Sequence, residues 1–412
     1  MAALVARHYR TGEQWTIRTE GDRIASIDVA SKSPIASVSP EVDSRRLIVA
    51  PALVDLQING RAGLDFLAES LSIDELTRLV VGWDRDGVGF ALPTVTTQSH
   101  ERLRTALSRL GTALDQVPVV AERVAGIHLE GPYLSPEEGP RGAHPLKHVR
   151  PPDWDEFQGL QQASGGRIRL ITLAPETAGA ASFIRRAVDS GVLVSIGHTA
   201  TDRHSLLEAI DAGASLSTHL GNGCHGRLDR HPNYLWDQLA DDRLSAMVIA
   251  DGHHLPDEVL RCFVRCKGSE RIVAVSDMTG MGGMPPGRYD RTALGAVEVL
   301  DDGRLVVAGQ RRYLAGAALP LWRAIERLAN VTDLTLAEAI DACSTRPGAI
   351  VGRNVAPIPD SATCLALLLQ VDEAATESRN RQATAGDGTR RFRVRPLALL
   401  RGGRMIDLTA VA

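Results

Sequence analysis

The chain of 412 residues contains few cysteines and few aromatic residues. Its five cysteines are an odd and sparse set, which argues against a disulfide framework and favours a reducing compartment, the cytoplasm. Cys262 and Cys266 lie four residues apart in a helix-like stretch, and we interpret them as small buried side chains rather than half of a metal site. Aromatic residues make up 4% of the chain, so alanine, valine, leucine and isoleucine must fill the core.

The sequence also lacks long apolar runs and an excess of charge of one sign. No stretch approaches the roughly 20 apolar residues that a membrane helix needs. The N-terminal residues show no apolar segment followed by a small-residue cleavage site, so we expect no secretory signal. The formal net charge is −4 and the arginines are scattered among acidic residues, which indicates no nucleic-acid or membrane partner. The expected partner is a small molecule.

Eight short apolar runs alternate with helix-like stretches from about residue 47 to residue 350. Most runs are continuously apolar, which is typical of parallel strands buried on both faces. Eight such units predict an α/β protein with a closed (β/α)8, TIM-like barrel. No glycine-rich dinucleotide fingerprint follows the first run, which disfavours a doubly wound open sheet. The runs span residues 47–57, 90–97, 124–133, 167–176, 192–200, 215–220, 245–252 and 271–278.

The two ends of the chain have a different character. Residues 1–46 contain short strand-like pieces joined by polar turns, and the last part of the chain repeats this pattern. We therefore predict that both termini meet in one small β-sandwich domain. The predicted domains are residues 1–48 with 352–412 for this β domain, and residues 49–351 for the barrel.

Three of the predicted strands end in side chains that bind metals. Glu130, His198 and His219 end the third, fifth and sixth strands, and a barrel brings such ends together at one mouth. One carboxylate and two imidazoles suit a divalent transition metal and leave a position for water. Asp277 ends the eighth strand, where it can take a proton from that water and return it to a leaving amine. These residues predict a metal-dependent hydrolase.

Several segments with these residues resemble the amidohydrolase superfamily, and within it the N-acetylglucosamine-6-phosphate deacetylases. The resemblance covers the chain up to about residue 350, and HLEGP followed closely by GAHP is its most distinctive part. It implies a hydrolase that removes the acetyl group from an N-acetyl amino sugar, with N-acetylglucosamine 6-phosphate giving glucosamine 6-phosphate and acetate. The matching segments are APALVDLQINGRAGLDF, GIHLEGPYLSPEEGPRGAHP, SIGHTAT, STHLGN, IADGHH, AVSDMTG and LAGAALPL.

The end of the first strand departs from the most common superfamily pattern. Many members have His-x-His there, as part of a second metal site, whereas this chain has Gln57 and Asn59. Because amides bind zinc less well than imidazoles do, we expect one divalent ion per subunit, with zinc first and iron, cobalt or manganese as alternatives. Gln57 and Asn59 are then expected to contact water or the substrate.

The resemblance also implies a substrate site. It places His144, next to Ala143 in GAHP, beside the scissile amide, where it polarises the carbonyl group. It implies a homodimer in which each subunit lends a histidine to the phosphate site of the other. The phosphate-site residues carried over are Asn222, the backbone N–H of Gly223, Arg230, and His254 from the second subunit, with Arg227 as a substitute for Arg230 or an addition to it.

Departures near the phosphate site leave other functions open. The chain reads HLGNGC where family members usually have HLFNAM or HLYNAM, and the segment that follows is rich in histidine and arginine. One alternative is a related barrel amidohydrolase that acts on an unphosphorylated N-acetyl sugar or an N-acyl amino acid. The other is a non-catalytic binding protein that kept the barrel, and retention of the four metal and base residues argues against it.

Overall fold

The structure, a computed structural model, describes residues 2–30, 46–292, 294–311, 314–375 and 390–409. The chain divides into two compact units. One consists of Met1–Val54, Trp83–Gly89 and Leu321–Ala412, and the other of Asp55–Gly82 and Phe90–Pro320.

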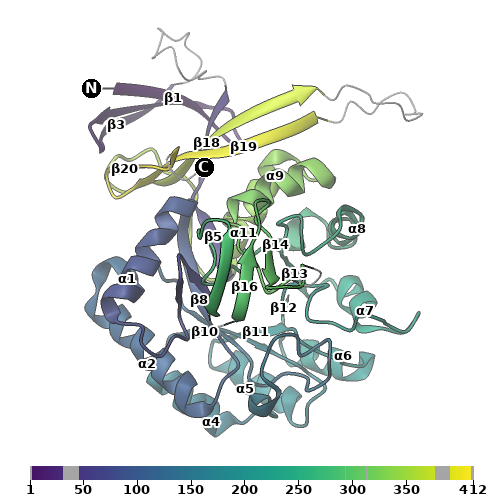
Figure 1. Cartoon of the computed structure of the whole chain (residues 1–412). Helices are drawn as coiled ribbons and strands as arrows, with labels where there is room; N and C mark the ends of the chain where they lie inside the picture. Colours follow the sequence, from purple (N-terminus) through teal and green to yellow (C-terminus); the bar gives the residue numbers. More distant parts are fainter. Residues whose placement is uncertain (1, 31–45, 293, 312–313, 376–389, 410–412) are drawn as a thin grey trace, which may run out of the picture. The chain divides into compact units, whose positions relative to one another are not determined.

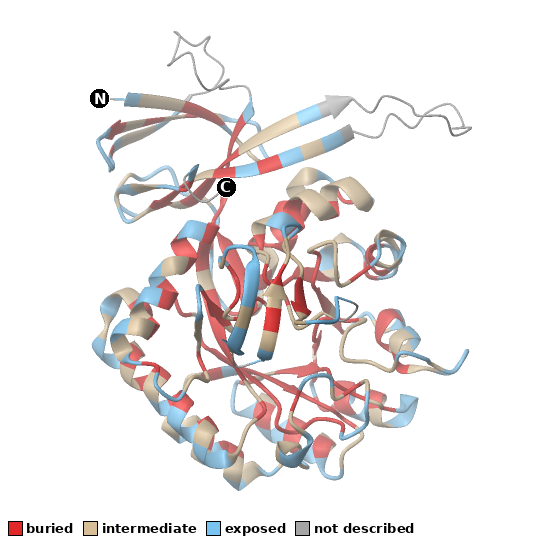
Figure 2. Cartoon of the chain, viewed as in Figure 1, coloured by how far each residue is buried: buried red, intermediate tan, exposed pale blue. Residues whose placement is uncertain are grey.

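The eight predicted strands are present and form one parallel eight-stranded sheet. Their side chains are almost all buried, which explains their continuously apolar sequences (Figure 2). The predicted (β/α)8 barrel is therefore confirmed. The strands, in the order in which they pair, are β14 (Ile272–Ala274), β13 (Ser245–Val248), β12 (Leu216–Ser217), β11 (Leu193–Ile196), β10 (Ile168–Leu173), β9 (Ile127–Glu130), β8 (Val88–Thr96) and β5 (Leu53–Ile58).

The barrel closes between the ends of β5 and β14. The backbone N–H of Asp277 donates to the carbonyl oxygen of Gln57 at 2.9 Å, and that of Asn59 donates to Met278 at 2.8 Å. Met278 also forms an isolated parallel bridge with Ile58. This seam matters because Asp277 and Asn59, two of the predicted site residues, form part of it.

Helices alternate with these strands around the barrel (Figure 1). Several begin at a residue whose side chain accepts a backbone N–H of the first turn: Ser99, Asp153, Asp202 and Asn233 do so for α2, α4, α6 and α7. The helices are α1 (Ile73–Gly82), α2 (His100–Gln116), α3 (Pro118–Ala121), α4 (Trp154–Ala163), α5 (Ala180–Asp189), α6 (Arg203–Asp211), α7 (Tyr234–Ala240) and α8 (Asp257–Lys267).

Two small sheets in the same unit have no counterpart among the predicted elements. One pairs β6 (Gly60–Arg61) with β7 (Leu64–Asp65). The other contains β15 (Gly287–Thr292), β16 (Gly295–Val299) and β17 (Leu305–Val307) and follows the last barrel strand. Val297, Val299 and Leu305 of this sheet belong to a small apolar cluster. Strand β15 is mostly exposed, so residues 287–292 show no clear strand pattern.

Both ends of the chain contribute to one β sheet in the other unit, as predicted. Its strands close on themselves instead of forming two separate layers, in the order β1, β2, β3, β20, β19, β18, β4. The predicted run 47–57 is in fact two strands: β4 ends at Pro51, which has no N–H to extend a ladder, and joins this sheet. The strands are β1 (Ala2–His8), β2 (Gln14–Glu20), β3 (Arg23–Ala30), β4 (Leu47–Pro51), β18 (Leu365–Ala375), β19 (Arg390–Arg401) and β20 (Arg404–Asp407).

The same unit contains helices α9 (Trp322–Val331), α10 (Leu336–Ala342) and α11 (Thr345–Ile350), which the predicted division assigned to the barrel domain. Helix α9 packs on β19: Asn330 Nδ2 donates to the carbonyl oxygen of Phe392 at 2.8 Å, and the N–H of Phe392 donates back to Asn330 Oδ1 at 2.8 Å. Within the described residues no helix is both long and apolar enough to span a membrane.

All five cysteines are free thiols. Cys262 and Cys266 lie on α8, as predicted, but both are exposed, so the prediction that they are buried is wrong. The buried stripe of this helix is formed by Leu260, Phe263 and Val264, and residues two and six positions after Leu260 point away from it.

Candidate active site

Glu130, His198 and His219 come together at one end of the barrel sheet. Glu130 is the last residue of β9, and His198 and His219 each lie two residues after the end of a strand, β11 and β12 respectively. Glu130 Oε1 lies 3.0 Å from His198 Nε2 and 3.1 Å from His219 Nε2, and the two Nε2 atoms are 3.0 Å apart. All three side chains are buried. The structure thus brings together the three ligands predicted from the sequence.

The hydrogen bonds of His198 fix which of its nitrogens is free to bind a cation. Its Nδ1 lies 2.9 Å from the carbonyl oxygen of Pro140, which can only accept, so Nδ1 carries the proton. In the neutral ring Nε2 therefore has a lone pair, and this lone pair points toward Glu130 and His219. Such an outer hydrogen bond on a ring nitrogen is common in metal-binding histidines. The donor set fits a divalent ion.

His144 lies at the edge of this cluster. Its Nε2 is 3.2 Å from His198 Nε2, and its Nδ1 is 2.8 Å from Thr97 Oγ1. Side-chain atoms of Glu130, His144 and His198 that can bind a metal all lie within 4.8 Å of one another, so this trio could also hold an ion. Burial, followed by the charge of His198, lowers the pKa of His144 to about 3, which makes its ring neutral.

The two amide side chains at the end of β5 donate to the two carboxylates of the site. Gln57 Nε2 donates to Glu130 Oε1 at 3.0 Å, and Asn59 Nδ2 donates to Asp277 Oδ1 at 2.8 Å. These bonds orient both amides, whose oxygens, Gln57 Oε1 and Asn59 Oδ1, have no hydrogen-bond partner among the described residues. Asn59 lines the substrate-sized cavity described below, whereas Gln57 is fully buried.

The backbone is strained at three of these positions. Among the described residues, the non-glycine residues with positive φ are Ala62 (51°), His198 (51°), His219 (28°) and Asp277 (47°). Residues other than glycine rarely adopt a positive φ, and those that do are concentrated at functional sites. The surrounding bonds therefore hold both histidines and the aspartate at some cost in stability.

Asp277 is half-buried, close to the glutamate. Burial, followed by the negative charge of Glu130, raises the pKa of Asp277 to about 6. The carboxylate therefore gains a proton more readily than an exposed aspartate does. A carboxylate with a pKa nearer neutrality is a more effective proton acceptor and donor in catalysis.

A cavity of about 620 Å³ opens onto the cluster, and this volume is ordinary for a small-molecule site. Three residues that were not predicted from the sequence also line the cavity: Asp65, Thr97 and Arg102. Thr97 follows the second barrel strand, and a single arginine early in α2 is not part of any recognisable motif. The predicted residues that line this cavity are Asn59, Glu130, Ala143, His144, His198, His219 and Asp277.

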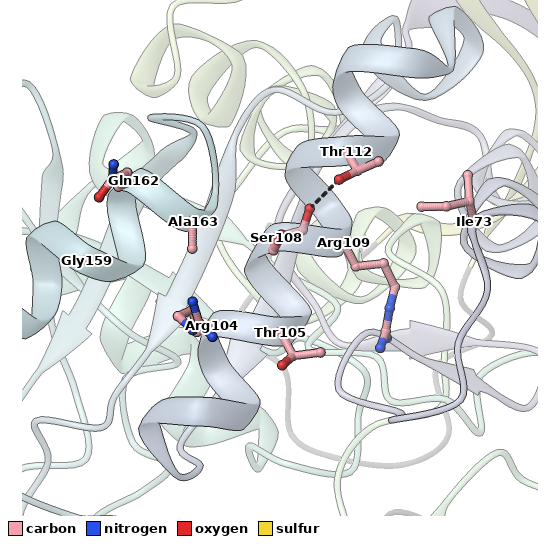
Figure 3. A pocket seen from close by; sticks show the side chains of 9 residues that line it. All are labelled: Ile73, Arg104, Thr105, Ser108, Arg109, Thr112, Gly159, Gln162 and Ala163. Atoms are coloured by element: carbon pink, nitrogen blue, oxygen red, sulfur yellow. Dashed lines mark hydrogen bonds between the residues drawn. The ribbon is translucent and has the colours of Figure 1, made fainter.

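Two other hollows lie outside this site. One of about 850 Å³ lies between α2 and α4, where Arg104, Ser108 and Gln162 line it (Figure 3). This hollow is larger than the cavity at the strand ends, but it shares no lining residue with that cavity and contains none of the predicted site residues. The other, of about 410 Å³, is lined by Arg227 and Tyr234 among others.

The residues predicted for the phosphate end do not line the 620 Å³ cavity of the single chain. Asn222 Nδ2 donates to the carbonyl oxygen of His219 at 3.3 Å. Arg227 and Arg230 are exposed, and Arg227 lines the separate 410 Å³ hollow. His254 Nδ1 pairs with Asp251 Oδ2 at 2.7 Å.

Gly223 has a packing role that the sequence did not reveal. A Cβ added there would lie 2.8 Å from His198 Nδ1, and its φ of +57° favours glycine. We expect Gly223→Ala to lower the free energy of unfolding by about 1–3 kcal/mol, measured by chemical denaturation. Gly226→Ala is the matched control, because an added Cβ there meets nothing within 4 Å. Equal losses in both variants would contradict this packing role.

The barrel, with histidine, glutamate and aspartate side chains gathered at its strand ends, defines an enzyme of the amidohydrolase class. No protein-family model matches the chain. The N-acetylgalactosamine-6-phosphate deacetylase of Escherichia coli O157:H7 is 34% identical over 350 residues, which cover 85% of this chain and 89% of that protein. The chain belongs to the family of N-acetylglucosamine-6-phosphate and N-acetylgalactosamine-6-phosphate deacetylases.

Two further relatives agree with this assignment. The N-acetylglucosamine-6-phosphate deacetylase of Bacillus subtilis (strain 168) is 29% identical over 355 residues, covering 82% of this chain and 87% of that protein. A crystal structure of N-acetyl-D-glucosamine-6-phosphate deacetylase from Mycobacterium smegmatis superposes with a TM-score of 0.78 at 25% identity, covering 98% of this chain and 100% of that chain. The family resemblance seen in the sequence is confirmed.

Proposed function

We propose that this enzyme hydrolyses the acetamide group of an amino-sugar 6-phosphate, with N-acetylglucosamine 6-phosphate as the first candidate substrate and glucosamine 6-phosphate and acetate as products. The observation that carries this proposal is the convergence of Glu130, His198 and His219, with Asp277 beside them, on one cavity. The names of the relatives supply the substrate class.

We assign the divalent ion to Glu130, His198 and His219, and zinc is the first candidate, with iron, cobalt and manganese as alternatives. His219 is preferred to His144 as the third ligand because its Nε2 contacts both Glu130 and His198, at 3.1 and 3.0 Å. Gln57 and Asn59 support a single ion, because an amide oxygen binds zinc less well than an imidazole does. When bound, such an ion would lower the pKa of water toward neutrality and polarise a carbonyl oxygen.

The side chains of this site divide the remaining work between them. Asp277 takes a proton from the attacking water while the water oxygen bonds to the acetyl carbon. Asp277 then returns that proton to the sugar nitrogen as the C–N bond breaks. Thr97 Oγ1 lies 2.8 Å from His144 Nδ1, and in the tautomer in which this hydroxyl donates to Nδ1 the ring proton lies on Nε2. That N–H group donates to the carbonyl oxygen as negative charge develops there.

We assign the phosphate to Asn222, the N–H of Gly223 and Arg230, with Arg227 as substitute or companion, and to His254 of the partner subunit in a homodimer. Arginine and backbone N–H groups suit the anionic oxygens of a phosphate. None of these residues lines the cavity of the single chain, which is consistent with a phosphate site completed by a second subunit. The five free thiols support a cytoplasmic location.

The test is acetate release from N-acetylglucosamine, N-acetylgalactosamine and their 6-phosphates. Because a hydrogen bond to a charged group contributes about 1.5–3 kcal/mol, Arg230→Ala should lower kcat/KM for a 6-phosphate by roughly 10- to 100-fold. It should leave the rate on the unphosphorylated sugar unchanged, and Arg227→Ala tests the substitute. Preference for the unphosphorylated sugar, unaffected by Arg230→Ala, would reject the phosphate assignment.

N-acetylgalactosamine 6-phosphate is the second candidate substrate, because the relative that is 34% identical is named for this epimer. The two sugars differ only in the configuration at C4, so the same site chemistry serves both. The ratio of their kcat/KM values in the same assay decides between them. No hydrolysis of any of the four sugars by metal-loaded protein would instead favour an N-acyl amino acid or a non-catalytic role.

A further inference from the structure

Asp55 is a buried carboxylate that the chemistry described so far does not use. It lies in β5 at 1% exposure, and within the described part of the chain it forms no ion pair. Burial raises its pKa to about 7. Burying a carboxylate without a cation is costly, and an apolar side chain of similar size would avoid that cost. The residue must therefore make contacts that an apolar side chain would not.

Those contacts join the two sides of the barrel seam. Asp55 Oδ1 accepts the backbone N–H of Gln57 at 3.2 Å and that of Ser276 at 3.1 Å. Its other oxygen has no hydrogen-bond partner among the described residues. Ser276 extends the connection, because its Oγ accepts the N–H of Met278 at 3.1 Å and donates to the carbonyl oxygen of Gln57 at 3.4 Å.

The residue between Ser276 and Met278 is Asp277, which has a φ of 47°. The regular strand β14 ends at Ala274, and beyond it a few separate bonds hold the segment, among them the one from Asp277 N–H to the carbonyl oxygen of Gln57. A strained conformation persists only where the surroundings over-determine it. Asp55 fixes the residue before Asp277 directly, and through Ser276 it fixes the residue after it.

We infer that Asp55, acting through Ser276, is a positioning residue that holds the backbone of Asp277 in its strained conformation and so aims its carboxylate into the cavity. This inference rests on the proposed role of Asp277 as the proton-transfer group. Closure of the barrel does not require Asp55, since the seam also has the backbone bonds from Asp277 to Gln57 and from Asn59 to Met278.

The test compares Asp55→Ala, which removes the acceptor, with Asp55→Asn, which keeps one acceptor oxygen. Because a misplacement of about 1 Å in a reacting group costs on the order of 100-fold, Asp55→Ala should lower kcat by roughly 10- to 100-fold. KM and the bound metal per chain should stay unchanged. Asp55→Asn should restore most of the lost kcat. Leu107→Ala is the matched control, because Leu107 is fully buried in α2, and its loss should lower the Tm without lowering kcat.

Two results would overturn the inference: a normal kcat in folded Asp55→Ala, or a loss in Asp55→Asn as large as in Asp55→Ala. If Asp55→Ala does not fold, Ser276→Ala tests the second link of the connection, because it removes the acceptor for Met278 N–H and leaves the bond from Ser276 N–H to Asp55 in place. An unchanged kcat in that variant would also overturn the inference. Failure of the underlying mechanism is separate, since it would appear as an active Asp277→Asn enzyme.

Discussion

Asp277→Asn is expected to lower kcat by about 10²–10⁴-fold, the usual contribution of a general acid–base group. Asparagine has the same shape and keeps an oxygen that can accept from Asn59, whose Nδ2 lies 2.8 Å from Asp277 Oδ1. The Tm should stay the same or rise, because burial and the charge of Glu130 both disfavour the ionised aspartate. Acetate release and thermal unfolding measure the two effects.

The pH dependence of the wild-type enzyme gives a second view of the same residue. Proton transfer from water requires the ionised carboxylate, so kcat should fall about tenfold per pH unit below the pKa of Asp277. That pKa is raised to about 6 by burial and by Glu130, and a bound cation lowers it. The acid limb is therefore expected at or below about pH 6. Near-normal activity in Asp277→Asn, with the same acid limb, would assign proton transfer to another group.

The barrel and its reactive end could be predicted because they depend on local and periodic features. Continuously apolar runs identify parallel strands, and in a barrel the residues that end these strands meet at one mouth. That rule predicts that Glu130, His198 and His219 meet, and in the structure the Nε2 atoms of His198 and His219 lie 3.0 and 3.1 Å from Glu130 Oε1.

The supporting contacts could not be predicted because they depend on three-dimensional closure. Asp55 and Ser276 are 221 positions apart, and only the seam between the first and last barrel strands makes them neighbours. Thr97 likewise reaches His144 across 47 positions. The short strands β15–β17 were missed for another reason, since the exposed β15 has no apolar alternation to detect.

The residues of the proposed phosphate site were hard to predict for a different reason. The resemblance assigns Asn222 and Gly223 to the phosphate, and in the structure both lie beside the reactive cluster, next to His219 and His198 respectively. Arg227 and Arg230 lie in exposed positions of a segment whose sequence departs from the family pattern. Contacts to a substrate or to a second subunit would decide their roles, and neither follows from the pattern of one chain.

Glu130→Gln is expected to cause the greatest loss of activity, because the oxygen it alters is the one shared by the whole cluster. Glu130 Oε1 contacts His198 Nε2, His219 Nε2 and, at 3.0 Å, Gln57 Nε2. An amide is a poor ligand for zinc, so the variant should retain little metal after dialysis. If the ion contributes several kcal/mol to the transition state, kcat should fall by roughly 10³-fold or more.

The matched control is Glu137→Gln, which removes a carboxylate that also pairs with a histidine, His225, at 3.0 Å. Its metal content and kcat should remain normal, because this pair does not line the reactive cavity. His219→Ala and His144→Ala then separate the two ligand sets: the first should lose metal, and the second should keep metal while kcat falls. If Glu130→Gln binds zinc as tightly as the wild type does, the ion is held by the histidines alone, and Glu130 must serve another step.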